Sequence, residues 1–421
     1  MNVSESPSST DIQPAPAARF STFSSLQNNG NFRLYWGGAF LSNVGTWMQS
    51  VAQGWLVFEL TGSTLLLGLV AFAGSIPILF LSIFGGVLAD RVERRRLMVY
   101  TQMGMMLLAF LLAALTFARV ITVWQIMAVA FCSGIVNALN APVRQSLVAD
   151  LVPRRDLQNA IALNSAQFQS SRILGPTLAG ITLAAVGPAW CFFVNGLSFL
   201  AVIAALLLVT VPALPVRPPQ SMLRNVAEGF RYVWRQPTIF ALLMVAAIPG
   251  LFGQPYQPML PAVVSDMLHM GATGLGLLES SAGTGALIGA LIVASLSRSK
   301  RRGRIQLYML TLFGLALVFF SQSHWLGTSI ALLVVVGMAS MAYNSLNQTF
   351  LQSLVDDDMR GRVMSLLTLA TLGLQPLGAL QAGAVGQRFG VSTALLIGGI
   401  ICVAVSVVAT RAKRGGLDDL V

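Results

Sequence analysis

The feature that most constrains this chain is a succession of apolar stretches, each about 20 residues long, separated by short polar connections. A helix of that length crosses the hydrocarbon core of a bilayer and satisfies its own backbone polar groups there. Only 10% of the residues carry charge, against about 25% in a typical soluble domain. We therefore expect an all-α membrane protein whose surface faces mainly lipid.

A long central connection over residues 212–237 divides twelve predicted membrane helices into six and six. This organisation predicts a tail at 1–30, a bundle over 31–211, a second bundle over 238–411 and a cytoplasmic tail at 412–421. The first tail is rich in Ser, Pro, Ala and Asn, which is typical of disorder, and lacks the pattern of a secretory signal. The predicted spans cover residues 34–59, 65–89, 97–118, 122–147, 157–186, 189–211, 238–263, 273–297, 304–322, 325–352, 361–387 and 391–411.

Basic residues gather in alternate connections, and on the other side of the predicted membrane only Arg119 and Arg388 occur. Cytoplasmic loops carry the excess of Lys and Arg, so the pattern predicts both termini in the cytoplasm. We expect the membrane to be a bacterial inner membrane. The pattern also explains the net charge of +11 without nucleic-acid binding. The basic connections lie at 91–96, 154–155, 217–235, 298–304, 360–362 and 411–414.

The central connection contains an amphipathic segment, Met222 to Trp234. Leu223, Val226, Phe230 and Val233 share one helical face, and arginines occupy the rest. This pattern predicts a helix on the cytoplasmic surface, attracted to anionic lipid.

The two halves resemble each other at an offset of 203 residues. Residues 134–187 and 337–390 share ten identities in 54 positions, including Gly187 with Gly390. A parallel repeat of two six-helix halves is the architecture of one large class of secondary transporters.

The second stretch ends in GGVLADRVERRRLM, residues 85–98, where an acid and several arginines meet the cytoplasmic end of a helix. This segment resembles the loop motif of the major facilitator superfamily, although Glu93 stands where that motif often has glycine. The second half has only a degraded copy, at 297–304. The residues that match the motif are Gly86, Asp90, Arg91, Arg94 and Arg95.

Four further segments are similar to the drug:proton antiporters of the macrolide- and enterobactin-exporter type. They are the stretch at 32–63, APVRQSLVADLVP at 141–153, RILGPTLAG at 172–180 and RGRVMSL at 360–366. The resemblance implies the major facilitator fold, a monomer, and export driven by the proton gradient with no cofactor.

The resemblance also implies that the loop motif latches the two bundles together in the outward-facing state. Asp90 would face the amino end of the eleventh span near Gly361, where the helix dipole favours an anion. Arg91 would pair with Asp150. The alternative is that the basic loop only fixes orientation, although orientation does not require the acid.

Two stripes of polar residues run along predicted spans at helical spacing. They either line a water-filled cavity or form hydrogen bonds between helices. The stripe on the first span is Thr46, Gln49, Ser50 and Gln53, and the stripe on the fourth is Ser133, Asn137, Asn140 and Arg144.

Two charged residues stand at predicted membrane depth, where a charge is costly and is usually functional. Arg172 lies midway along the fifth span and either acts in transport or binds carbonyls freed near Pro176. With Gly175 and Gly180, Pro176 resembles the fifth-helix motif of the antiporter branch, a thin and bendable helix surface. Glu279, in the first turns of the eighth span, is either a proton carrier or a residue at the outer mouth.

We expect a secondary transporter that exports a small amphipathic organic compound, drug- or siderophore-like, by proton antiport and alternating access. An importer or facilitator of a small metabolite is an alternative, and a receptor or channel is an alternative of another class. An ATP-driven pump is disfavoured because no GxxxxGK[ST] loop occurs, and an enzyme because neither HExxH nor GxSxG occurs. The cysteines and the two histidines form no metal-ligand spacing.

Overall fold

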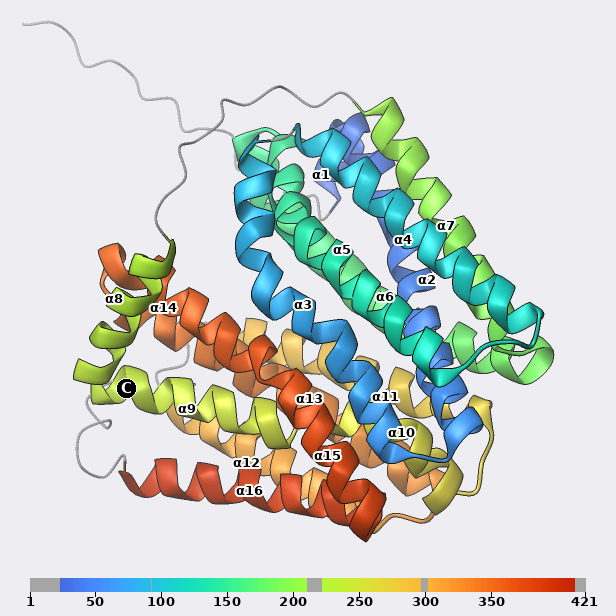
Figure 1. Cartoon of the computed structure of the whole chain (residues 1–421). Coiled ribbons are helices and arrows are strands. Elements are labelled where there is room, and N and C mark those ends of the chain that lie inside the picture. The colour runs from blue at the N-terminus through green and yellow to red at the C-terminus, as the bar shows by residue number, and fades with distance from the viewer. Residues whose placement is uncertain (1–22, 92, 210–221, 297–301, 413–421) are drawn as a thin grey trace, which may run out of the picture.

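The computed structural model describes residues 23–91, 93–209, 222–296 and 302–412. All regular secondary structure in this described part is helical, as expected (Figure 1). Before the central connection lie α1 (Ser24–Asn28), α2 (Gly30–Thr61), α3 (Thr64–Arg91), α4 (Arg94–Phe117), α5 (Val123–Asp150), η1 (Arg154–Asp156), α6 (Leu157–Val186) and α7 (Pro188–Leu208). After it begin α8 (Met222–Arg235), α9 (Pro237–Phe252), α10 (Tyr256–Ala262), η2 (Val263–Met267), α11 (Ala272–Ser295), α12 (Arg302–Phe320), α13 (Leu326–Leu354), α14 (Asp357–Thr368), η4 (Leu369–Gly373), α15 (Gln375–Phe389) and α16 (Val391–Ala412).

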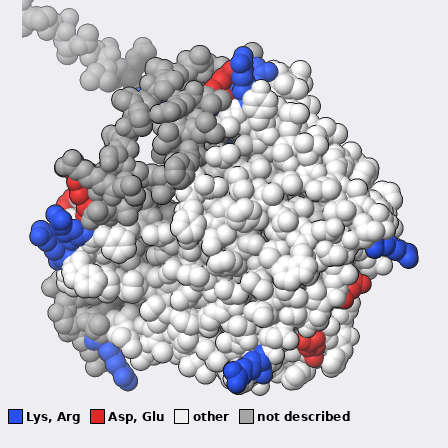
Figure 2. All heavy atoms as spheres, in the orientation of Figure 1, with Lys and Arg blue, Asp and Glu red and all other residues white. Residues whose placement is uncertain are grey.

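Ten helical segments within the described residues are long and apolar enough to cross a membrane. Two of these segments are composite, since α9 continues through α10 and η2, and α14 through η4 and α15. The helices α2 and α6 have comparable length but more polar side chains. The view in Figure 2 shows a broad surface without charged groups, which appear mainly around its margins. The chain is therefore a multi-pass membrane protein.

The long helices pack in two groups. The first group contains α2 to α7, and the second contains α9 to α16 (Figure 1). The groups meet chiefly where α3 packs on α15 and where α6 packs on α11. This arrangement leaves α2, α3, α11 and α15 in position to enclose a space between the groups.

Tight turns lie at one end of both groups, which we call the turn end. Gly187 and Gly390 join consecutive helices there, and both have φ of 88°, a conformation that favours glycine. These two residues correspond at the offset of 203 found in the sequence. The opposite end carries Arg94, Arg155 and Arg362, and we call it the basic end.

Three clusters of buried apolar side chains show where the groups are joined. The largest occupies the turn-end half and draws on both groups, from Met48 and Leu67 to Leu275 and Ala382. At the basic end each group has its own cluster, one around Phe32 to Val209 and one around Val233 to Leu367. The groups thus share a core at the turn end and have separate cores at the basic end.

The last residues of the expected N-terminal tail are ordered, which corrects the boundary drawn at residue 30. Helix α1 docks on the turn before α6, where the buried Ser25 hydroxyl donates to the Asp156 carbonyl at 3.0 Å. The Asn29 side chain donates to the Asp156 carboxylate, also at 3.0 Å. Short polar side chains thus hold a segment whose composition indicates disorder.

The amphipathic segment of the central connection forms α8 and packs on α14. Glu228 pairs with Arg362 at 3.0 Å, and the Tyr232 hydroxyl donates to the Asp356 carboxylate at 3.0 Å. Desolvation raises the pKa of the Tyr232 hydroxyl. Val233 is buried while Phe230 is exposed, so the predicted common face is divided. Helix α8 therefore belongs to the second group rather than only to a membrane surface.

Candidate functional site

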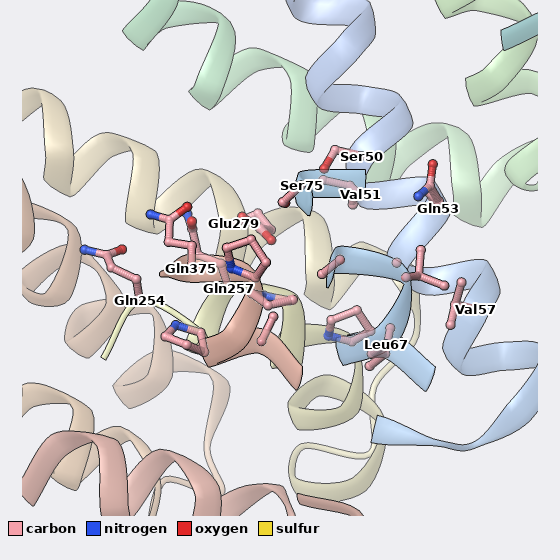
Figure 3. A pocket seen from close by; sticks show the side chains of 18 of the residues that line it. Ser50, Val51, Gln53, Val57, Leu67, Ser75, Gln254, Gln257, Glu279 and Gln375 are labelled. Carbon is pink, nitrogen blue, oxygen red and sulfur yellow. The ribbon is translucent and has the colours of Figure 1, made fainter. Parts of the chain in front are cut away.

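A cavity of about 340 Å³ lies between the two groups. Helices α2 and α3 form one wall, and α10, α11, α15 and the end of α9 form the other (Figure 3). Its described lining is Trp47, Ser50, Val51, Gln53, Gly54, Val57, Leu67, Val70, Ala71, Ser75, Gln254, Pro255, Gln257, Pro258, Pro261, Leu275, Glu279, Gln375, Pro376 and Ala379. Glu279 is the one charged residue in this lining, and the other polar groups are neutral amides and hydroxyls.

A second cavity of about 290 Å³ adjoins the first and shares Gln254 and Gln375 with it. It lies within the second group, along α9, α13 and the α14–α15 helix. Its described lining contains no charged residue. The lining residues are Ala246, Gly250, Gln254, Tyr343, Asn344, Asn347, Gln348, Met364, Leu367, Thr368, Thr371, Leu372 and Gln375. Together the two cavities form a site with one carboxyl group near one end and only neutral polar groups at the other.

The two charges predicted at membrane depth come together at the first cavity. Glu279, the eighth residue of α11, lies on its wall. Arg172 comes from the first group, and its guanidinium lies 5.7 Å from the centroid of the Trp47 ring, also in the cavity wall. Arg172 is close enough to Glu279 for electrostatic interaction. The two groups thus contribute opposite charges to the surroundings of the first cavity.

The contact between α6 and α11 lies beside these charges and is made of small residues. An added Cβ at Gly276 would lie 2.6 Å from the carbonyl oxygen of Pro176 and 2.7 Å from the Cα of Gly180. The hydroxyls of Thr177 and Ser280 lie 2.7 Å apart across the same contact. Close backbone approach of this kind is how small residues join membrane helices.

The remaining glycine of the fifth-helix motif, Gly175, faces the first group. An added Cβ there would lie 2.5 Å from the Cβ of Trp47 and 2.8 Å from the carbonyl oxygen of Val44. The motif therefore gives α6 two thin faces, one on α2 and one on α11.

The contact between α3 and α15 has the same construction without the charges. The Thr64 hydroxyl donates to the Gly383 carbonyl at 3.0 Å, and the Ser63 hydroxyl donates to the Gln387 side chain at 2.8 Å. Gly68 lies directly against the carbonyl group of Ala379.

The residues of the stripe predicted on the first span lie in different surroundings. Gln53 and Ser50 line the cavity. Gln49 is buried inside the first group, where its carbonyl oxygen accepts a hydrogen bond from Asn195 at 2.7 Å. The Thr46 hydroxyl donates to the Ser42 carbonyl of its own helix at 2.8 Å and does not line the cavity.

The stripe predicted on the fourth span lines neither of these two cavities. Asn140 is buried and accepts a hydrogen bond from the Thr101 hydroxyl of α4 at 3.3 Å. Arg144 is half-buried and interacts electrostatically with Tyr35. Asn137 is half-buried on the same helix. Of the two alternatives for the stripe, Asn140 therefore fits a hydrogen bond between helices rather than the lining of either cavity.

The described residues of the loop motif bind within the first group. Arg94 pairs with Asp150 at 2.8 Å, so Asp150 already has a partner other than the expected Arg91. Arg95 donates to the carbonyl oxygens of Leu206 and Leu207 at the end of α7, at 2.7 and 2.6 Å.

The other residues of the expected latch are only partly covered by the described residues. The side chains of Asp90 and Arg91 and the surroundings of Gly86 lie outside the described residues, although α3 continues to Arg91. The sequence suggested that Gly361 lies at the amino end of its helix. Helix α14 begins at Asp357, however, so Gly361 lies in its second turn.

Several lining residues of the second group were missed by the sequence analysis: Gln254, Gln257, Gln375, Asn344, Asn347 and Gln348. A signal existed for part of the set, because Ser340, Tyr343, Asn344 and Asn347 share one face of α13 at helical spacing. Gln254, Gln257 and Gln375 each precede a proline, in or beside helices whose irregular turns obscure the spacing.

Comparison with known proteins agrees with this geometry. Residues 20–419 match the family model described as transmembrane secretion effector. The chain is 27% identical to the staphyloferrin A transporter of Staphylococcus aureus over 89% of its own length and 94% of the relative's. It is 28% identical to the enterobactin exporter EntS of Citrobacter koseri over 86% of each chain. It is 23% identical to macrolide efflux protein A of Streptococcus pyogenes over 90% of its own length and 96% of the relative's.

Solved structures show the same fold. The nucleoside transporter NupG superposes with a TM-score of 0.71 at 14% identity, covering 90% of this chain and 98% of NupG. A bacterial homologue of the human lysosomal transporter Spinster, in an inward-facing and unoccupied conformation, gives a TM-score of 0.71 at 15% identity over 96% and 99% of the two chains. This chain is a transporter of the major facilitator superfamily and belongs to its transmembrane secretion effector family.

Proposed function

We propose that this protein exports small amphipathic organic compounds across a bacterial inner membrane in exchange for protons. In this proposal α2 and α6 cross the membrane together with the ten more apolar segments. The twelve helices form two repeated six-helix bundles, and the protein is a monomer. The basic end faces the cytoplasm, because Lys and Arg are retained there during insertion.

The observation that carries the proposal is the cavity between two groups that share a core only at the turn end. With the basic end in the cytoplasm, this state is closed to the outside and receives cargo from the inside. Opening the α3–α15 and α6–α11 contacts while closing the basic end would release it outward. The similar staphyloferrin A, enterobactin and macrolide transporters support organic cargo and the outward direction.

The proton step rests on Glu279 and Arg172. A carboxylate on α11 and a guanidinium on α6 that interact electrostatically attract the groups to one another. Protonation of Glu279 removes that attraction, and deprotonation restores it. A single acid in the described lining thus links the proton to the position of the two groups.

The loop motif supplies the opposite latch. With Arg94 and Asp150 bound to each other, Asp90 is the acid we assign to the amino end of α14 in the outward-facing state. The positive end of the helix dipole at that first turn, which begins at Asp357, favours an anion. Asp90→Asn is then expected to leave the protein inserted but to reduce transport by about tenfold, the equivalent of about 1.4 kcal/mol. Normal flux from well-expressed Asp90→Asn protein would contradict the latch.

The experiment uses inverted vesicles loaded with acid, with ethidium and erythromycin as probes. Export into the vesicle should make the interior more alkaline when a probe is added to wild-type protein. Glu279→Gln should abolish the proton signal, while Glu59→Gln, at the exposed turn end, should retain it. Probe movement without a proton signal would refute antiport, and full coupling in Glu279→Gln would remove Glu279 from the mechanism.

A further inference from the structure

Asn347 on α13 carries a hydrogen-bond donor that has no partner in the described structure. The residue is 1% exposed and lines the second cavity. Its Oδ1 accepts a hydrogen bond from the Gln306 side chain at 2.7 Å, which fixes the orientation of the amide. Its Nδ2 is buried without a partner. Buried donors in folded proteins are nearly always paired, so an unpaired one in a cavity wall indicates a missing acceptor.

Two neighbouring side-chain amides in the same wall already donate hydrogen bonds within the protein. The Asn344 side chain donates to the Ser340 carbonyl at 3.1 Å. The Gln254 side chain donates to the Ser340 hydroxyl at 2.7 Å and to the Tyr343 hydroxyl at 3.3 Å. Asn347 is therefore the fully buried amide of this described wall whose donor a ligand can satisfy without breaking an existing bond, while the amides of Gln348 and Gln375 are more exposed.

The surroundings define the chemistry of the acceptor. The described lining of this cavity has no charged residue, so a carboxylate or phosphate would lose its hydration without gaining a counter-charge. Met364, Leu367 and Leu372 contribute apolar surface. An uncharged carbonyl oxygen, in an ester, amide or ketone flanked by apolar groups, fits both conditions.

We propose that Asn347 forms a subsite for a carbonyl oxygen on the uncharged, apolar part of the cargo. The shared Gln254 and Gln375 join this subsite to the cavity that contains Glu279, so one molecule can occupy both. This assignment rests on the proposed function, because it takes the cavity as the cargo site.

The test compares binding of erythromycin, which has carbonyl groups, with binding of ethidium, which has none. Both are measured by equilibrium dialysis on purified wild-type protein and on Asn347→Leu. One hydrogen bond is lost, so Asn347→Leu should weaken erythromycin binding by about tenfold and leave ethidium binding within about twofold. Ethidium binding by Asn347→Leu also serves as the check that this variant is folded.

Asn137→Leu is the matched control, since Asn137 lies on α5 and lines neither of the two cavities. It should leave the preference for erythromycin over ethidium unchanged. Absence of erythromycin binding, unchanged binding in Asn347→Leu, or equal losses for both probes would overturn the subsite and leave water as its occupant. If erythromycin binds through Asn347 but vesicles do not move it, the subsite stands and the proposed export fails.

Discussion

The two contacts that join the helix groups, α3 with α15 and α6 with α11, have similar architecture and different surroundings. Both bring backbones together over glycine, at Gly68 and Gly276, and both add hydroxyl bonds. Only the α6–α11 contact includes Arg172 and Glu279 on its two helices. We infer that both contacts seal the turn end, whereas the α6–α11 contact also responds to protons. The difference predicts unequal sensitivity to substitution.

The largest effect is expected from Gly276→Leu. Its side chain would begin 2.6 Å from the Pro176 carbonyl oxygen and 2.7 Å from the Gly180 Cα, and both are backbone atoms that cannot rotate away. The α6–α11 contact should open, and ethidium export should fall to background in inverted vesicles. Gly271→Leu is the control, because an added Cβ there meets no atom within 4 Å. Retained export in Gly276→Leu would show that this contact need not close during transport.

Arg172→Ala should have the next largest effect. It removes the positive partner of Glu279 and the cation–π contact with Trp47, and we expect about a tenfold loss of export, equal to about 1.4 kcal/mol. Arg119→Ala alters an exposed turn-end arginine, where solvent weakens charge interactions, and should change export by less than about twofold. Equal, mild losses in both variants would remove Arg172 from the coupling step.

The smallest effects come from single hydroxyls and compare the contacts directly. Ser280→Ala removes a hydroxyl that lies 2.7 Å from Thr177 and 3.1 Å from the Ile173 carbonyl, beside the charges. Thr64→Val removes one bond of 3.0 Å to Gly383, away from them. One intramembrane hydrogen bond contributes about 0.6 kcal/mol, so each variant should change export rate by about threefold or less. We expect only Ser280→Ala to shift the dependence of export on external pH, and a shift of the same size in Thr64→Val would abolish the distinction.

The sequence predicts the helices better than it predicts which helix face meets the cavity. Gln49 and Gln53 stand one turn apart on α2, yet Gln53 lines the cavity and Gln49 bonds to Asn195 on α7. Helical spacing places both on one side, but the neighbour that each meets depends on how α2 tilts across two groups. The ten long apolar segments of the described residues, in contrast, follow from local hydrophobicity and length alone.

Residues that correspond in the two halves also show that the sequence does not predict which side chains line the cavities. At the offset of 203 residues, Arg144 corresponds to Asn347 and Arg172 to Gln375. Both second-half amides line the cavities, while Arg144 does not line either of them. The sequence analysis singled out the arginines because charge at membrane depth is conspicuous. It passed over the amides because a neutral amide in an apolar span is equally common as a bond between helices.

The polarity of α2 and α6 has a consequence for how the protein is made. A helix with several amide side chains gains little by entering lipid alone. These two helices form hydrogen bonds with each other. The Trp36 indole donates to the Leu163 carbonyl at 3.1 Å, and the Gln167 amide donates to the Trp36 carbonyl at 3.2 Å. Since α2 is synthesised about a hundred residues before α6, we expect it to wait at the translocon, held by nearer helices, until α6 emerges. A ribosome stalled before α6 should therefore leave α2 accessible to water-soluble reagents.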